Sequence, residues 1–194
     1  MTTASTPKGE RRRQALVEAA ADLFAERGFD AIRHRAVAER AGLPLASTTY
    51  YFDSLDELIT SAVVRRGEAE LARGRAQLQD VSEPQPSFDT MIELVLDQLL
   101  GVEHDAEAVL LRYERLVATG RRPYLRPVMR AMAVELNALI SDIFVRCGMP
   151  LPAERIEQVI ALVDGAVVNA LIEIHSDPRA TARRMLRAFF TDQH

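Results

Sequence analysis

The sequence predicts an all-α protein of about nine helices. Apolar residues recur at helical spacing along the whole chain, with no convincing alternation of the strand type. Hydrophobic residues make up 48% of the 194 positions, which is enough for a real core in a chain of this length. Residues 81–87 carry two prolines and lose the apolar period, so they predict a break between an N-terminal and a C-terminal part.

Three helices followed by a long one are expected in the N-terminal part. A stripe of apolar residues that includes Leu23 and Phe24 predicts the first helix, and Gly28 ends it. Ser54 followed by Glu57 has the pattern of a capping box, which predicts the start of the long helix. The expected ranges are a first helix that ends at Arg27, then residues 33–41, 45–51 and 54–79.

Five more helices are expected after the break. The first of them begins at Phe88 and is apolar on nearly all sides, so it should be buried in a bundle that could host a ligand pocket. Asp177 and Pro178 form a start signal for the last helix, with Asp177 as the N-cap and Pro178 at the first helical position. The expected ranges are residues 88–102, 106–119, 124–147, 153–175 and 178–192.

Composition and motifs argue against several classes of protein. A net charge of −4 disfavours a chain that coats nucleic acid non-specifically, although it allows a local basic face. The single cysteine excludes an internal disulfide, and neither a secretory leader nor a long apolar run is found, so we expect a cytoplasmic protein without a membrane span. The four histidines lie far apart, and no phosphate loop or nucleophile signature occurs. We therefore expect no enzymatic activity, no cofactor and no metal.

The segment from Gly42 to Phe52 carries no charged residue and places several hydroxyl side chains beside two tyrosines. A short helix of small hydroxyl residues after a tight turn is the layout of a helix-turn-helix, whose second helix enters the major groove of DNA. Serine and threonine can bond to base edges or phosphates, and arginines cluster nearby at residues 11–13 and at Arg33 and Arg35. An ordinary helical hairpin whose tyrosines pack in the core stays open as the alternative.

Residues 15–59 resemble the DNA-binding domain of the tetracycline-repressor (TetR) family of bacterial transcription regulators. The matching features are, in order, Leu23-Phe24, Gly28-Phe29, Val37-Ala38, Ala41-Gly42, Tyr51-Phe52 and Leu58. The resemblance implies a homodimeric, ligand-responsive repressor on a palindromic double-stranded DNA operator, released by a small, mostly apolar effector. It implies a helix-turn-helix domain over residues 8–53, a connecting helix over 54–80, and a ligand-binding and dimerisation domain over 87–194. An all-helical protein-interaction module without a DNA target is the alternative function.

Three positions depart from the family pattern. The family usually has threonine at Arg33, tyrosine at Thr49 and lysine at Leu55. Those family residues contact phosphates, so the resemblance implies that other side chains take over part of this role. Arg35 stands where the family often reads a base. The expected DNA contacts are Arg11, Arg12, Arg33, Arg35, Leu45, Ala46, Ser47, Thr48, Thr49, Tyr50 and Tyr51.

Two further sites are expected in the C-terminal part. Polar residues that interrupt its apolar stretches are either effector contacts or structurally paired or exposed side chains. With apolar neighbours, they give the candidate effector-binding set of Met91, Val95, Gln98, Leu99, Arg112, Tyr113, Met132, Leu136, Asn137 and Asn169. The apolar stripes of the last two helices either close the domain core or, as the resemblance implies, pair with a second subunit. The expected dimer-interface residues are Val163, Val167, Leu171, Met185 and Phe189.

Overall fold

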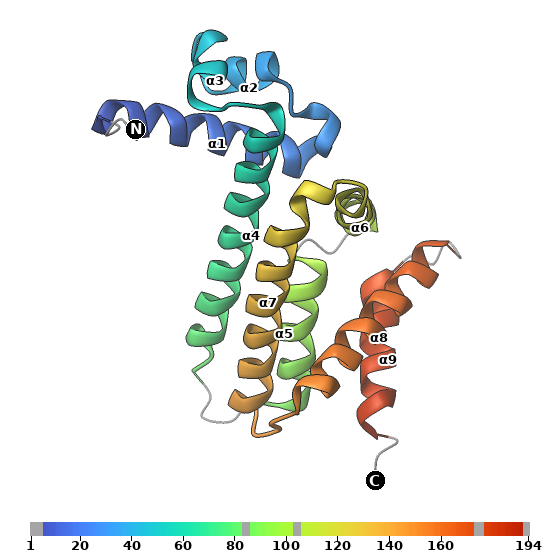
Figure 1. Cartoon of the computed structure of the whole chain (residues 1–194). Helices are drawn as coiled ribbons and strands as arrows, with labels where there is room; N and C mark the ends of the chain where they lie inside the picture. Colours follow the sequence, from blue (N-terminus) through green and yellow to red (C-terminus); the bar gives the residue numbers. More distant parts are fainter. Residues whose placement is uncertain (1–5, 83–85, 103–105, 173–176, 192–194) are drawn as a thin grey trace. The chain divides into compact units, whose positions relative to one another are not determined.

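The computed structural model describes residues 6–82, 86–102, 106–172 and 177–191. These residues form nine α-helices and two 3₁₀ turns and contain no strand, which confirms the all-α prediction. The elements, labelled in Figure 1, are α1 Pro7–Arg27, η1 Phe29–Ala31, α2 His34–Arg40, α3 Ala46–Tyr51, α4 Leu55–Asp80, α5 Phe88–Leu100, α6 Ala106–Gly120, η2 Pro123–Leu125, α7 Arg126–Arg146, α8 Ala153–Ile172 and α9 Pro178–Thr191.

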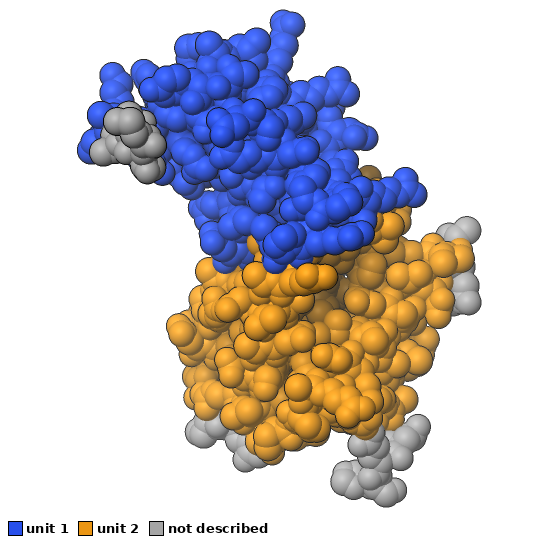
Figure 2. All heavy atoms as spheres, in the orientation of Figure 1, with its two compact units in different colours: residues 1–69, 118–128 blue, residues 70–117, 129–194 orange. Residues whose placement is uncertain are grey.

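The chain divides into two compact units, which Figure 2 shows in different colours. The N-terminal unit consists of residues 1–69 together with residues 118–128, and the C-terminal unit consists of residues 70–117 and 129–194. Helices α4, α6 and α7 therefore each contribute residues to both units. The domain boundaries expected from the sequence, at residues 8–53, 54–80 and 87–194, stay a prediction.

Helices α1, α2 and the beginning of α4 build the core of the N-terminal unit. Leu16, Val37 and Leu58 are fully buried there. Helix α2 packs on α1, and α3 lies beside α2 (Figure 1). Gly42 has a φ of 64°, a left-handed conformation that lets the chain turn between α2 and α3.

Two helix starts have the caps that the sequence predicts. The Ser54 hydroxyl accepts from the Glu57 amide at 3.1 Å, and the Glu57 carboxylate accepts from the Asp53 amide at 2.8 Å. The Asp177 carboxylate accepts from the Ala180 amide at 2.8 Å, ahead of α9. These bonds satisfy amide groups that have no partner inside the helix.

Helix α5 forms the centre of the C-terminal unit and is buried on nearly all sides, as predicted. All seven of its apolar candidates are at most 5% exposed: Met91, Ile92, Leu94, Val95, Leu96, Leu99 and Leu100. Helices α8 and α9 pack against each other and against α5. The core that they share also takes in Ile140, Ile143 and Phe144 of α7.

Some helix ends differ from the expected ranges by a few residues. Helix α5 ends at Leu100 rather than residue 102 because Gly101 adopts a φ of 90°. Helix α7 begins at Arg126 rather than residue 124 because residues 123–125 form a 3₁₀ turn that starts with a proline. The predicted ends of α8 and α9, at residues 175 and 192, lie outside the described residues. Among the helices described, none is both long and apolar enough to cross a lipid bilayer.

Candidate nucleic-acid interface and effector domain

The N-terminal unit exposes most of the surface that the sequence predicts for DNA. On and beside α3, Leu45 is 53% exposed and Tyr50 is 80% exposed. Ala46 and Thr49 are also exposed, while Ser47 and Tyr51 are partly buried. The rings of Tyr50 and Tyr51 meet edge to face at 4.8 Å between centroids. The hairpin alternative requires both tyrosines to pack in the core, and they do not.

Thr48 is a correction to the expected DNA-contacting set. Its side chain is fully buried, and its hydroxyl donates to the Leu45 carbonyl at 2.8 Å. Serine and threonine hydroxyls often bond back to the preceding helical turn in this way. Thr48 thus packs on the inner side of α3. The exposed residues on and beside α3 remain the candidates for contact with DNA.

Exposed arginines lie in the first half of α1 and at the start of α2. Arg33, the N-cap of α2, and Arg35 in its first turn are both exposed. Arg11 and Arg12 are exposed in the first half of α1, whereas Arg13 turns inward toward α4. The Arg13 guanidinium lies 5.0 Å from the centre of the Phe52 ring and 3.8 Å from the Glu57 carboxylate. Helix α2 is held to α1 by Arg40, which donates two bonds to the Glu26 carboxylate, at 2.9 and 2.7 Å.

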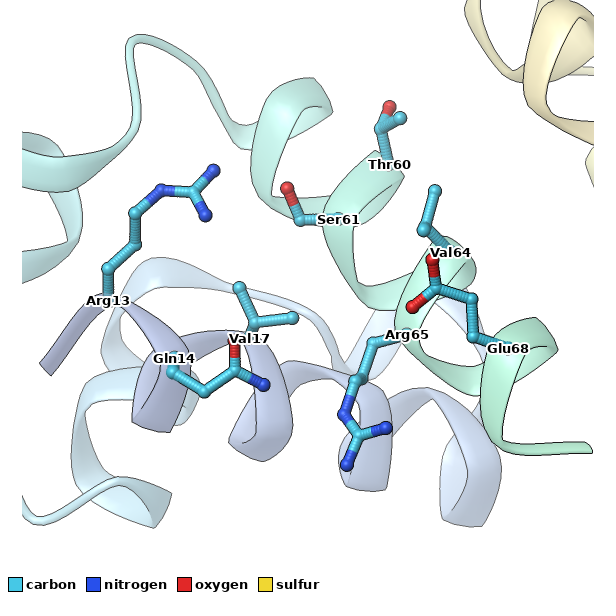
Figure 3. A pocket seen from close by; sticks show the side chains of 8 residues that line it. All are labelled: Arg13, Gln14, Val17, Thr60, Ser61, Val64, Arg65 and Glu68. Carbon is cyan, nitrogen blue, oxygen red and sulfur yellow. The ribbon is translucent and has the colours of Figure 1, made fainter. Parts of the chain in front are cut away.

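A cavity of about 370 Å³ lies between α1 and α4 in this same unit (Figure 3). Its lining is mostly polar, with Val17 and Val64 as its apolar residues, and Arg13 and Arg65 both line it. Its lining residues are Arg13, Gln14, Val17, Thr60, Ser61, Val64, Arg65 and Glu68. None of them belongs to the effector-binding set that the sequence predicts.

Arg112, one of the predicted effector contacts, is bonded to other residues of the C-terminal unit. Its guanidinium donates to the carbonyls of Leu99 and Gln98 at 2.8 and 3.1 Å, and it pairs with the Glu70 carboxylate at 3.1 Å. Arg112 therefore links α6 by hydrogen bonds to α4 and to the end of α5. Arg112 has the structurally paired role that the sequence left open.

Tyr113 and Asp164 form a polar pair between α6 and α8. The Tyr113 hydroxyl donates to the Asp164 carboxylate at 2.8 Å, and the Tyr113 side chain is largely buried. Burial raises the pKa of Tyr113, and the nearby Asp164 charge raises it further, so the hydroxyl stays protonated. Asp164 is partly buried and has no ion pair within the described part of the chain. Tyr113 is among the effector contacts predicted from the sequence, whereas Asp164 is not.

The other predicted effector contacts fall into three groups. Met91, Val95 and Leu99 are buried in the core around α5, and Gln98 lies at its edge, where it donates to Gln77 at 3.3 Å. Met132, Leu136 and Asn137 are partly buried on α7. Asn169 is a correction: it is exposed on α8, on the outer side of the helix rather than toward the bundle interior.

Two predicted dimer-interface residues are also corrections. Val163 and Val167 are both fully buried in the core of their own unit. Leu171 and Phe189 are partly buried against the same core, and Met185 is 40% exposed. The outer face of α8 instead presents Ala161, Gly165, Val168 and Ile172. A Cβ added at Gly165 would meet no atom within 4 Å.

A charged cluster that the sequence analysis missed joins α9 to α5. Arg179 is only 5% exposed and bonds to the Glu93 carboxylate at 2.9 Å, to the Gly101 carbonyl at 3.2 Å, and to Asp97. Arg183 also donates to Glu93. The hydrogen bond from Arg183 lowers the pKa of Glu93 from 4.5 to about 2, with Arg179 adding to the shift and burial opposing it. The charged partners lie 82 to 90 residues apart, so no local sequence pattern predicts their pairing.

The fold, with an uncharged helix α3 that follows a glycine turn and exposed arginines at the start of α2, defines a helix-turn-helix protein with a helical C-terminal part. Residues 16–62 match the family profile described as bacterial regulatory proteins of the tetR family. Residues 86–192 match the profile of the tetracyclin repressor-like C-terminal domain. The chain belongs to the TetR family of transcription regulators, which confirms the resemblance.

Solved structures of similar proteins support this assignment. The multidrug binding protein EbrR complexed with proflavin is 30% identical, with a TM-score of 0.67 over 91% of this chain and 98% of that one. EbrR complexed with malachite green is 32% identical, with a TM-score of 0.63 over 91% and 96%. A transcriptional regulator from Saccharomonospora viridis in complex with choline shares the fold, at 17% identity and a TM-score of 0.70 over 95% and 97%. A search of curated protein sequences gave no match.

Proposed function

We propose that this protein is a repressor that binds a palindromic operator as a homodimer and is released by a small organic effector. The observation that carries the DNA-binding part is the exposed, uncharged surface of α3 with Arg33 and Arg35 beside it. No carboxylate interrupts residues 42–52, and a carboxylate there would face the phosphates. A two-fold dimer would place its recognition helices in successive major grooves, about 34–36 Å apart. A gel-shift titration with the DNA upstream of the protein's own gene tests the proposal.

Arg35 is expected to read a base. Arg35→Ala should weaken operator binding by about 1–3 kcal/mol and relax the preference at one base pair. Arg27→Ala, which removes an exposed arginine at the far end of α1, is the matched control and should leave that preference unchanged. Binding to a set of operators mutated one base pair at a time measures both effects. An identical base preference in the wild type and in Arg35→Ala would remove this residue from the readout.

The proposed effector is an organic cation with a large apolar surface. EbrR binds ethidium and malachite green, which are aromatic cations. A cation that enters an apolar bundle needs a carboxylate to offset its desolvation. Asp164 suits this role because it is partly buried and its bond partner Tyr113 carries no charge. Met132, Leu136 and Asn137 remain proposed contacts of the effector.

Asp164→Asn should therefore weaken the binding of malachite green by about tenfold or more, since a charge-assisted contact contributes about 1.5–3 kcal/mol. Asp142→Asn removes an exposed carboxylate from α7 and should leave the dissociation constant unchanged. Isothermal titration in the absence of DNA gives both constants. Equal affinities for the two variants would exclude Asp164 as the counter-ion.

The proposed dimer seam is the outer face of α8 with the neighbouring part of α9. Val168 is 40% exposed, Ile172 is 72% exposed and Met185 is 40% exposed, so the single subunit leaves large apolar side chains in water. Ala161 and Gly165 precede Val168 along α8, are exposed as it is, and would allow two helices to approach closely. This face replaces the buried Val163 and Val167 in the proposed interface, while Leu171 and Phe189 stay at its edge.

A further inference from the structure

The cavity between α1 and α4 lies within the N-terminal unit and is lined by none of the proposed effector contacts. Its two arginines come from opposite walls (Figure 3). Arg13 extends from α1 toward the beginning of α4, where its guanidinium is 3.8 Å from the Glu57 carboxylate. Arg65 extends from α4 toward α1, where its guanidinium is 3.7 Å from the Glu18 carboxylate. Each wall therefore supplies one guanidinium group, at different points along the cavity.

Neither arginine is held tightly by its carboxylate. The Glu57 carboxylate already accepts from a backbone amide at 2.8 Å, and the Glu18 carboxylate accepts from the Gln14 side-chain amide at 3.2 Å. The two arginines approach these carboxylates only at ion-pair distance, and their side chains are 36% and 43% exposed. Exposed pairs of this kind contribute little to stability, and a guanidinium group has several N–H donors. Both arginines can therefore exchange their present partners for an anionic ligand.

Apolar side chains lie between the two arginines. On α1, Val17 follows Arg13 by about one turn, and on α4, Val64 directly precedes Arg65. At about 1.5 Å per residue, α4 advances by about 12 Å from residue 57 to residue 65. A ligand with a carboxylate at each end and methylene groups between them matches this order. Guanidinium groups pair with carboxylates, and the valines pack against an aliphatic chain.

The remaining polar groups of the lining restrict the ligand further. The Thr60 hydroxyl already donates to a backbone carbonyl at 2.7 Å. The Ser61 hydroxyl lines the cavity and can donate to a carboxylate. The Glu68 carboxylate lies about one turn after Arg65 and would repel an anion that extended beyond that arginine. This carboxylate therefore limits the length of the ligand.

We propose that this cavity is a binding site for an aliphatic dicarboxylate of medium length. One carboxylate pairs with Arg13 and accepts from Ser61, and the other pairs with Arg65. The aliphatic chain packs on the two valines between them. The site lies in the unit that contains the helix-turn-helix, whereas Asp164, the proposed partner of a cationic effector, belongs to the C-terminal unit. Binding of the dicarboxylate does not depend on the proposed operator or effector.

Isothermal titration of the free protein with suberate tests the site. Suberate should saturate one site per chain and bind more tightly than the shorter succinate or than octanoate, which has a single carboxylate. Arg13→Gln and Arg65→Gln should each weaken suberate binding by about tenfold or more, because each removes a charge-assisted pair. Arg12→Gln and Arg73→Gln remove the same charge from exposed positions of α1 and α4 and should bind as the wild type does. Equal affinities for the three acids, or no saturable binding of suberate, would overturn the proposal.

Hydrogen exchange locates the bound acid. Suberate should slow amide exchange in residues 13–18 and 57–68, because a ligand that binds only the closed form makes local opening rarer, and should leave α5 unchanged. Asp164→Asn should bind suberate with wild-type affinity, which separates this site from the proposed cation site. Protection confined to the C-terminal unit, or a loss of suberate binding in Asp164→Asn, would place the acid elsewhere and contradict the assignment.

Discussion

Val167→Asp is expected to unfold the subunit rather than to separate two subunits. Val167 is fully buried in the core that α5, α8 and α9 share. An unpaired carboxylate at that site costs several kcal/mol of folding free energy, a large part of the roughly 5–15 kcal/mol that stabilises a typical domain. Urea unfolding followed by circular dichroism should show a large loss of stability or no cooperative transition.

The adjacent residue supplies the matched control. Val168 directly follows Val167 in α8 but is 40% exposed, so Val168→Asp should stay folded with a nearly unchanged urea midpoint. Because Val168 lies in the proposed dimer seam, this variant should sediment as a folded monomer at concentrations where the wild type is dimeric. A Val168→Asp protein that remains fully dimeric would place the interface elsewhere. A stable, folded Val167→Asp protein would contradict the assignment of the core.

Arg179→Met is expected to lower the free energy of unfolding by about 3–5 kcal/mol. The substitution leaves Asp97, which is 14% exposed, without its cation, and removing one partner of a buried ion pair has a cost of this size. The control is Arg187→Met, because Arg187 pairs with Asp89 where both side chains are well exposed. An exposed pair contributes at most about 1 kcal/mol. Similar urea midpoints for the two variants would show that the cluster does not anchor α9.

The same cluster should make stability depend on acid pH. The pKa of Glu93 is about 2 in the folded chain against 4.5 otherwise, so the unfolded chain binds this proton more readily. The stabilisation is complete above about pH 5 and is lost as the pH falls toward 2. Glu93→Gln should flatten the dependence of the urea midpoint on pH in that window. Because Glu93 is 41% exposed, solvent reduces the size of the effect but leaves its sign.

Local signals in the sequence account for most of the fold. The caps at Ser54 and Asp177 and the stop at Gly28 depend on neighbouring residues, so the sequence alone predicts them. The apolar residues on nearly all sides of α5 likewise predict its burial, because a helix without a polar face must be buried. Such features need no knowledge of distant segments.

Local signals could not predict which side of a helix faces the core, or which distant charged residues form ion pairs. The apolar stripe of α8 covers more than half of the helix, so periodicity does not say which residues face the subunit core. Packing against α9 and α5 selects Val163 and Val167 for the core and leaves Val168 and Ile172 outside. Thr48 resembles its exposed neighbours in chemistry and differs only in the side of α3 that it occupies.

The end of α5 has an electrostatic consequence for what the bundle can admit. A buried helix carries about half a negative charge at its C-terminus, and its last carbonyls would attract any cation that entered. Here Arg112 occupies the carbonyls of Gln98 and Leu99, and Arg179 occupies that of Gly101. Two guanidinium groups thus neutralise this helix dipole from within the protein. An organic cation that entered the bundle, as proposed above, would therefore find these three carbonyls at the end of α5 already bonded to arginine.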